Sequence, residues 1–324
     1  MYTSRLRLRS ALSAALIFAA AAVHAQTYPA KPVRVVVPFP PGAGADITTR
    51  LVTPRLSEAL GQQFVVDNRP GAAGHIGGEI VAHSPADGYT LLSTPASIVI
   101  SASLYKKLPY NLERDLEPVG MMASTPFILV VHPSLPVKTV KDFVALAKQK
   151  PGQLLFASTG NGGTPHLAME RLMMQTGIKL THVPYKGTPP AVTDVISGQV
   201  QTMFANTLSV LPHIKSGRLR SVAIGSLKRS AATPDIPTFD ESGVKDFEAI
   251  TWFGMLAPTG TPREVIQRVN AEINKAVASP EVREKLIGQG ADPFTMTPQE
   301  FKKFFSAEMA RWPKIVKAAG VTLD

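Results

Sequence analysis

The fold of this chain is constrained most by a regular alternation of short β-branched, apolar runs with segments that have helical patterns. Strands are expected at residues 33–39, 63–67, 90–94, 127–131, 154–158, 180–183, 200–205 and 219–225, and helices at 46–60, 75–82, 140–150, 164–176, 189–197 and 208–216. Strands that alternate with crossover helices form parallel sheets. The sequence therefore predicts an α/β protein.

The C-terminal third has a different character. After a strand expected at residues 251–257, three helices are each preceded by a hydroxyl residue and a proline, at Thr261-Pro262, Ser279-Pro280 and Thr297-Pro298. Glu264 and Glu300 complete two predicted capping boxes. These signals concern helix starts and indicate no function.

The first 25 residues are predicted to be a secretory signal peptide. Arg5, Arg7 and Arg9 precede an apolar run at residues 11–23, and Val23-His24-Ala25 offers a small-residue cleavage site. The apolar run is shorter than the ~18 residues typical of a membrane span. We therefore expect an exported protein located in the periplasm.

The charge balance and the absence of cysteine argue against several kinds of binding site. The chain has 34 Lys and Arg against 24 Asp and Glu, and removing the three signal-peptide arginines lowers the excess from +10 to +7. These charges are scattered rather than clustered, so nucleic acid is not an expected partner. A mild positive excess favours small anions. The absence of cysteine excludes disulfides and thiolate metal sites.

Two stretches are candidate crossings between domains. Prolines bracket an apolar strand at residues 125–136, and a loop rich in Ser, Ala, Pro and Lys spans residues 226–237. With both as crossings, residues 26–125 and 232–324 form one domain and residues 126–231 form the other.

Familiar catalytic patterns are missing from the sequence. It has neither a G-x-S-x-G elbow nor an H-E-x-x-H motif nor a Walker loop. Its seven histidines are far apart in the sequence, and none has a metal-ligand partner at helical spacing. The S-x-x-K match at Ser103–Lys106 lacks its companion motifs. A non-enzyme without metal or cofactor is therefore expected, and a secreted hydrolase using Ser158 or Ser103 is the alternative.

Three loops that contain glycine lie between a predicted strand and a predicted helix. They are "PPGAGAD" with Gly42 and Gly44, "NRPGAAG" before residue 75, and "STGNGGTP" at residues 158–165. Helix N-termini leave N–H groups unpaired and attract anions, which glycines allow to approach closely. The first loop is a poor dinucleotide motif, because Ile47 stands at the third glycine position. Carboxylate binding is the favoured interpretation, and plain tight turns are the alternative.

Several longer segments carry a family resemblance. "YPAKPVRVVVPFPPGAGADITTRL", "VVDNRPGAAGHIGGEIVAHSPADGYTLL", "STGNGGTPHLAMERL", "VPYKGTPPAVTDVISGQV" and "TWFGMLAPTGTPREVIQRVN" resemble the tripartite tricarboxylate transporter substrate-binding proteins, also called Bug receptors. The resemblance covers residues from about 28 to the C-terminus. It implies a periplasmic receptor of the type II binding-protein fold, in which two α/β domains joined by two crossovers close on a small carboxylate.

The same resemblance implies partners and a role. The receptor would deliver its ligand to the membrane permease subunits of a tripartite transporter, and a monomer is expected. An orphan receptor that senses a carboxylate for a signalling partner is the alternative.

Carried over to this sequence, the resemblance places ligand-binding residues in four segments: Phe39, Gly42, Ala43, Gly44 and Asp46; Gly74 and His75; Ser158, Thr159, Gly160, Asn161, Gly162, Thr164 and His166; and Tyr185 and Lys186. Structural roles compete at three of them. Asp46 suits a first-turn helix acid, Thr164 a helix cap, and His166 a side chain that holds the loop by a hydrogen bond.

Two departures from the family pattern concern the ligand. Ala43 and Ala45 stand where the family usually has glycine and threonine, and His75 stands where it usually has asparagine. Ala45 lacks a hydroxyl that could touch a ligand, while His75 adds an imidazole. The identity of the carboxylate is therefore left open.

Overall fold

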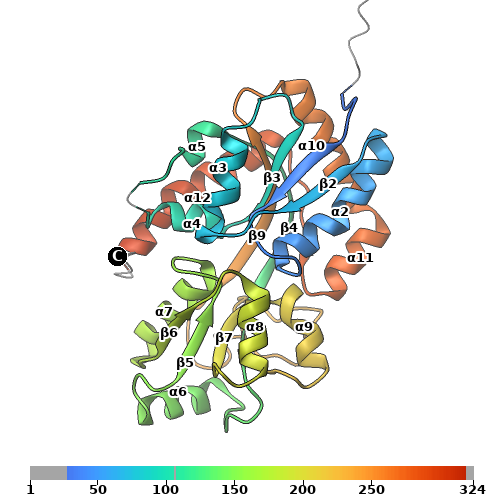
Figure 1. Cartoon of the computed structure of the whole chain (residues 1–324). Coiled ribbons are helices and arrows are strands. Elements are labelled where there is room, and N and C mark those ends of the chain that lie inside the picture. Colours follow the sequence, from blue (N-terminus) through green and yellow to red (C-terminus); the bar gives the residue numbers. More distant parts are fainter. Residues whose placement is uncertain (1–27, 106, 319–324) are drawn as a thin grey trace, which may run out of the picture.

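The computed structural model describes residues 28–105 and 107–318. The predicted signal peptide at residues 1–25 lies outside them. Within the described ranges, no helix is both long and apolar enough to cross a membrane. Figure 1 shows two lobes, one above the other, and strands β4 and β9 run between them.

A mixed sheet with the strand order β2-β1-β3-β9-β4 forms the centre of the first lobe. Its strands are β1 (Val33–Val37), β2 (Phe64–Asn68), β3 (Thr90–Pro95), β9 (Ile250–Pro258) and the first part of β4 (Leu116–Val131), with a short β10 (Asp292–Pro293) beside β4. β1 is parallel to β2 and β3, whereas β9 is antiparallel to β3 and β4.

Helices cover both faces of this sheet. Successive residues of β1 point to opposite faces, and apolar side chains lie on both faces, so each face is covered by a layer of helices. Val35 and Val37 lie in a core formed with helices α2 (Gly44–Leu60), α10 (Arg263–Ala278) and α11 (Pro280–Gly288). Val36 lies in a second core formed with α3 (His75–Ala82), α4 (Ser97–Ala102), α5 (Leu112–Asp115) and α12 (Pro298–Ala318). A short 3-10 turn, η1 (Ala72–Gly74), precedes α3.

The second lobe has its own sheet. The second part of β4 pairs antiparallel with β7 (Thr202–Asn206) and β8 (Arg220–Ile224), and β5 (Leu155–Ser158) lies parallel between β7 and β6 (Thr181–Pro184). Helices α6 (Val140–Gln149) and α7 (Thr164–Thr176) pack on one face, and α8 (Thr188–Ile196) and α9 (Thr207–Lys215) on the other.

The two connections between the lobes lie side by side. β4 pairs with β9 as far as Pro126 and with β7 and β8 from Phe127 onward. The Phe127 N–H donates to the Ala249 carbonyl at 2.8 Å, and β9 begins at the next residue, Ile250, opposite Pro126. Both crossings are therefore strands of one antiparallel pair, which we call the hinge strands.

The predicted domain boundaries at residues 125 and 231 stay a prediction. β4 changes its pairing partners close to the first one. Around the second, Phe239, Phe247 and Ala249 pack into the core of the second lobe. This packing favours a later boundary, near residue 249, because these side chains have their apolar neighbours in that lobe.

The α/β prediction is confirmed element by element. All the strands and helices predicted before residue 226 are present, and their ends are shifted by no more than two residues except at the start of β4, which begins at Leu116 instead of residue 127. Before residue 226, the 3-10 turn η1, helices α4 and α5 and the first part of β4 were not predicted. α4 is short and contains the β-branched run Ile98, Val99 and Ile100, while Pro118 and Gly120 in β4 look like strand breakers and are accommodated by shifts in register.

Only part of the predicted helix capping is correct. Thr297 and Glu300 form the expected box, since Glu300 N–H donates to Thr297 Oγ1 at 3.2 Å and Thr297 N–H to a Glu300 carboxylate oxygen at 2.8 Å. The box at Thr261 is wrong, because its hydroxyl donates to the Pro258 carbonyl at 2.7 Å and α10 begins after Pro262. Ser279 precedes α11 as predicted, but its hydroxyl donates backward to Ala276.

Candidate ligand-binding site

The predicted glycine loops of the two lobes meet at a small cavity of about 30 Å³, which we call the inner cavity. That space holds only one or two waters. First-lobe or hinge residues lining it are Phe39, Ala43, Gly44, Ala45, Pro95, Ser97, Thr251 and Phe253, and second-lobe residues lining it are Phe127, Thr159, Thr164, Pro165, Thr188 and Asn206.

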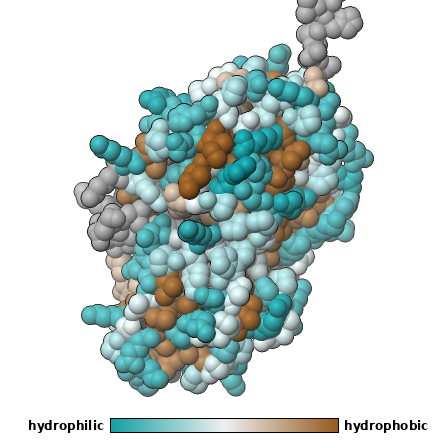
Figure 2. Space-filling view, in the orientation of Figure 1, coloured by the Kyte–Doolittle hydropathy of each residue, from teal (hydrophilic) through white to brown (hydrophobic). Residues whose placement is uncertain are grey.

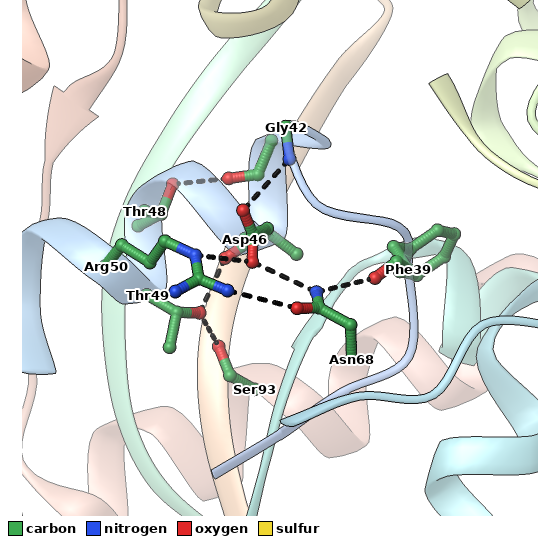
Figure 3. Close-up of polar contacts among 10 residues, drawn as sticks. Phe39, Gly42, Asp46, Thr48, Thr49, Arg50, Asn68 and Ser93 are labelled. Atoms are coloured by element: carbon green, nitrogen blue, oxygen red, sulfur yellow. Dashed lines mark hydrogen bonds and ion pairs between the residues drawn. The ribbon is translucent and has the colours of Figure 1, made fainter. Parts of the chain in front are cut away.

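The first loop connects β1 to α2 and is held by Asp46. This carboxylate is 3% exposed and accepts the Gly42 N–H at 2.9 Å through Oδ2. Its Oδ1 accepts from Arg50 Nε at 2.9 Å and from Asn68 Nδ2 at 3.0 Å (Figure 3). Asp46 is thus a first-turn acid whose oxygens are occupied within the lobe, and it is not among the cavity-lining residues.

The N-terminus of α2 faces the cavity without a side-chain cap. Its N-cap residue is Ala43, which offers no capping group. A Cβ at Gly44 would lie 2.8 Å from the Phe253 ring and 2.9 Å from Asn206 Oδ1. Glycine is therefore required there for close packing, and the first-turn N–H groups remain available to a ligand.

The second loop connects β5 to α7 and is held by two histidines. Ser158 Oγ lies 2.6 Å from His182 Nε2 and accepts the Gly160 N–H at 3.1 Å. The Gly162 N–H donates to His166 Nδ1 at 3.1 Å, as the loop-holding interpretation of His166 predicts. The two imidazoles stack with their centroids 3.9 Å apart. Burial, together with the neighbouring His166, lowers the pKa of His182 to about 4.

Thr164 differs from its predicted capping role. Gly163 is the N-cap of α7, and Thr164 is the first helical residue. Its hydroxyl is buried and has no hydrogen-bond partner among the described residues. Ser97, which comes from the first lobe and lines the same cavity, also has a buried hydroxyl without a partner there. Each lobe therefore contributes to the inner cavity one buried hydroxyl that has no hydrogen-bond partner within the described part of the chain.

A third uncapped helix reaches the cavity from the second lobe. α8 begins at Thr188 after Gly187, whose φ of +120° favours glycine. Sequence reasoning missed Thr188, Ser97 and Asn206 as cavity residues. The Gly-Thr-Pro sequence shared by residues 163–165 and 187–189 is a signal that could have found Thr188.

A larger outer compartment of about 210 Å³ adjoins the inner cavity and shares Phe39 and Thr159 with it. Other predicted residues that line it are Gly74, Gly160, Asn161, Tyr185 and Lys186, together with the unpredicted Pro38, Gly71, Ala72, Ala73, Tyr105 and Pro184. The Tyr185 hydroxyl donates to Asp194 at 2.6 Å, and burial raises its pKa to about 12. Lys186 is exposed at the rim.

Six predicted residues lie outside both linings: Gly42, Asp46, His75, Ser158, Gly162 and His166. His75 is the most distinct of them, because it is 3% exposed and bonded to Tyr110 at 2.8 Å and to Ser101 at 2.9 Å. Burial lowers the pKa of His75 to about 4. The His75 side chain therefore packs inside the first lobe, whereas the sequence predicted that it would lie at the rim of the cleft.

The lobes are in contact across the mouth of the site. A Cβ at Gly187 of the second lobe would lie 2.5 Å from Pro40 Cδ of the first. Gly42 of the first lobe likewise faces Pro189 of the second, at 3.8 Å from the corresponding Cβ position. In the space-filling view the two lobes abut on this face, with separate hydrophobic patches on each (Figure 2). The arrangement is therefore a closed one.

Comparison with known proteins identifies this architecture. Residues 48–321 match the family model of the tripartite tricarboxylate transporter family receptor. The chain belongs to this family. Its fold is that of the Bug-type periplasmic binding proteins, as the resemblance implied. The protein is thus a transporter receptor rather than an enzyme.

Individual relatives of the receptor match over nearly its whole length. Protein BugT of Bordetella pertussis is 41% identical over 306 residues, which are 94% of each chain. The solved structure of R. palustris Rpa4515 with adipate is 37% identical, has a TM-score of 0.89 and covers 91% of this chain and 99% of its own. MatC from Rhodopseudomonas palustris, with bound malate, is 29% identical with a TM-score of 0.85, covering 89% and 100%.

Proposed function

We propose that this receptor captures a small carboxylate between its two lobes in the periplasm and delivers it to the membrane permease subunits of a tripartite tricarboxylate transporter, acting as a monomer. The observation that carries the proposal is the pair of buried, unpartnered hydroxyls of Ser97 and Thr164 at the inner cavity. A buried polar group without a partner is costly, and a bound carboxylate oxygen would satisfy both.

The backbone around these hydroxyls suits an anion. α2, α7 and α8 all begin at the inner cavity, and none has a side-chain cap. Unpaired N–H groups and the partial positive charge of helix N-termini favour a carboxylate. No charged side chain is among the described residues that line this cavity, so recognition would rest on N–H and O–H donors.

The two adjoining spaces suggest how a ligand with two ends would lie if Phe39 and Thr159 left a passage between them. One carboxylate would occupy the inner cavity, and the rest of the molecule would extend past Phe39 and Thr159 into the outer compartment. Lys186 at its rim would suit a second anionic group. The adipate and malate bound by relatives have this character, and they are the first acids to try.

Calorimetric titration of the purified mature protein with mono-, di- and tricarboxylates tests the proposal. Binding of at least one acid is expected, and Thr164→Val should weaken it about tenfold or more, since a hydrogen bond to a charged group contributes ~1.5–3 kcal/mol. Thr233→Val is the matched control, because Thr233 also has a buried unpartnered hydroxyl but lines neither cavity. Binding of uncharged compounds alone, or turnover of esters, would contradict the proposal.

A further inference from the structure

A third and larger cavity, of about 520 Å³, lies between the lobes. We call it the rear cavity and define it by Met121, Met174, Trp252, Phe294, Phe304 and Trp312. Its size and its group of aromatic and methionine side chains are those of a small-molecule site, and four charged residues also line it. Small-molecule sites favour domain interfaces. None of these six residues lines the inner cavity or the outer compartment.

The rear cavity and the inner cavity lie on opposite faces of hinge strand β9. Successive side chains of a strand point to opposite faces. Accordingly Trp252 lines the rear cavity and the next residue, Phe253, lines the inner cavity. Thr251 and Thr164 border both spaces, so only a thin wall separates them.

Both lobes contribute walls to the rear cavity. Met174 lies on α7 of the second lobe, whereas Phe304 and Trp312 lie on α12 of the first. When two rigid bodies rotate about a hinge, closing the space on one face of the hinge widens the space on the other. In this closed arrangement the inner cavity is small and the rear cavity large, as that rotation requires.

Three of the four charged side chains at the rear cavity, those of Glu308, Arg171 and Arg311, have partners within the protein. Glu308 accepts from Trp252 Nε1 at 3.3 Å and from Trp312 Nε1 at 2.9 Å, and it lies 3.3 Å from Arg311. Arg171 donates to the backbone carbonyls of Asp246 and Glu248. The lining charges, Glu248 and Glu308 against Arg171 and Arg311, sum to zero. An uncharged occupant therefore suits this cavity better than an ion.

We propose that the rear cavity binds an uncharged, apolar molecule with aromatic rings, and that its occupation favours the closed cleft. The coupling to the cleft rests on the proposed function. Opening the cleft brings the apolar walls of the rear cavity together and removes them from water. A molecule between these walls opposes that movement, so it strengthens carboxylate binding, and the carboxylate strengthens its binding by the same factor.

N-phenyl-1-naphthylamine, an uncharged fluorophore that accepts energy from tryptophan, is the test probe. The chain has two tryptophans, and both line the rear cavity. Tryptophan-sensitised emission is expected to saturate at one probe per chain. Saturating adipate, or the first acid found to bind, should lower the probe's Kd about fivefold, and saturating probe should lower the acid's Kd equally.

A matched pair of surface variants locates the probe. Met174 is 60% exposed, so Met174→Lys should fold normally, and its charge should weaken probe binding about tenfold. Leu227 is 59% exposed and lies away from this lining, so Leu227→Lys should bind the probe like the parent protein.

Four outcomes overturn the inference: no probe binding, equal binding by both variants, displacement of the probe by the acid, or a dimer in light scattering that the probe dissociates, which would make a second copy the occupant. Failure of the proposed function appears separately, as absence of acid binding without the probe. The saturation measurement and the Met174→Lys comparison then still decide whether the site exists.

Discussion

The two glycine-containing loops at the inner cavity have similar positions but are held by different side chains. Each brings an uncapped helix N-terminus to the inner cavity. The first loop is held by the Asp46 carboxylate with its Arg50 and Asn68 partners, whereas the second is held by the stacked imidazoles of His166 and His182. One support is a carboxylate and the other is a pair of imidazoles, so each loop can be disturbed separately by a different substitution.

Removing the carboxylate support of the first loop should have the largest effect. Asp46→Ala leaves the Gly42 N–H and the Asn68 amide without their buried acceptor, and Arg50 without its counterion. We expect a loss of about 2–3 kcal/mol in the free energy of unfolding, discounted because Arg50 is half exposed, and a loss of carboxylate affinity above tenfold. Urea unfolding and calorimetry measure the two.

Asp67→Ala is the control for that variant. Asp67 pairs with Arg34 and Arg69 in the same lobe but lines neither ligand cavity. Asp67→Ala should lower the free energy of unfolding by less than about 1 kcal/mol, because partly exposed ion pairs contribute little. It should leave the affinity for the carboxylate unchanged. Equal loss of affinity in both variants would mean that Asp46 does not hold the loop specifically.

The histidine support of the second loop should weaken on acidification through His182. Because the pKa of His182 is lowered to about 4, only the unfolded chain takes up its proton as the pH falls below 6.5. Stability is therefore lost between pH 6.5 and 4, with the same sign for His75 and, in direction, for His213. His182→Phe keeps an aromatic ring but cannot titrate, so its free energy of unfolding should fall by about 1 kcal/mol less from pH 6.5 to 4.5, a value discounted because His182 is only partly buried. Parallel pH profiles would contradict this role.

The smallest effect is expected from adding one hydrogen-bond donor to the first loop. Ala45 lines the inner cavity, and Ala45→Thr returns a hydroxyl to it. An added donor should raise carboxylate affinity about threefold, as expected for ~0.5–1 kcal/mol. A fall in affinity would instead show that space limits binding, and Ala45→Val, which adds similar bulk without a donor, separates the two effects by calorimetry.

Regular local patterns made most of the fold predictable. β-branched runs such as Val33–Val37 and the Thr297–Glu300 box encode their structure within a few residues. The first part of β4 does not, because its path depends on pairing with β9, and register shifts around Gly120 accommodate its breakers. Thr261 matched a local cap pattern, yet its hydroxyl bonds to Pro258 in the preceding turn.

The candidate site was predictable as loops but not as contacts. Glycines 42, 44, 160 and 162 marked the two loops, whereas Ser97 and Asn206 reach the cavity only through the packing of distant elements. His182 carries no sequence signal for its role, since its hydrogen bond to Ser158 joins two strands 24 positions apart. His75 follows Gly74, which lines the outer compartment, but the first turn of α3 directs the His75 side chain toward Tyr110 and Ser101.

The place of β9 in the first sheet has a consequence for the order of folding. β9 lies between β3 and β4, and its pairing of Leu256 with Leu92 spans 164 positions. The cores of the second lobe draw only on residues 127–249 and form from one continuous stretch. Pairings this distant form slowly, and unpaired edges of β3 and β4 are exposed until they do. We therefore expect the lobe that contains the earlier part of the sequence to be completed last.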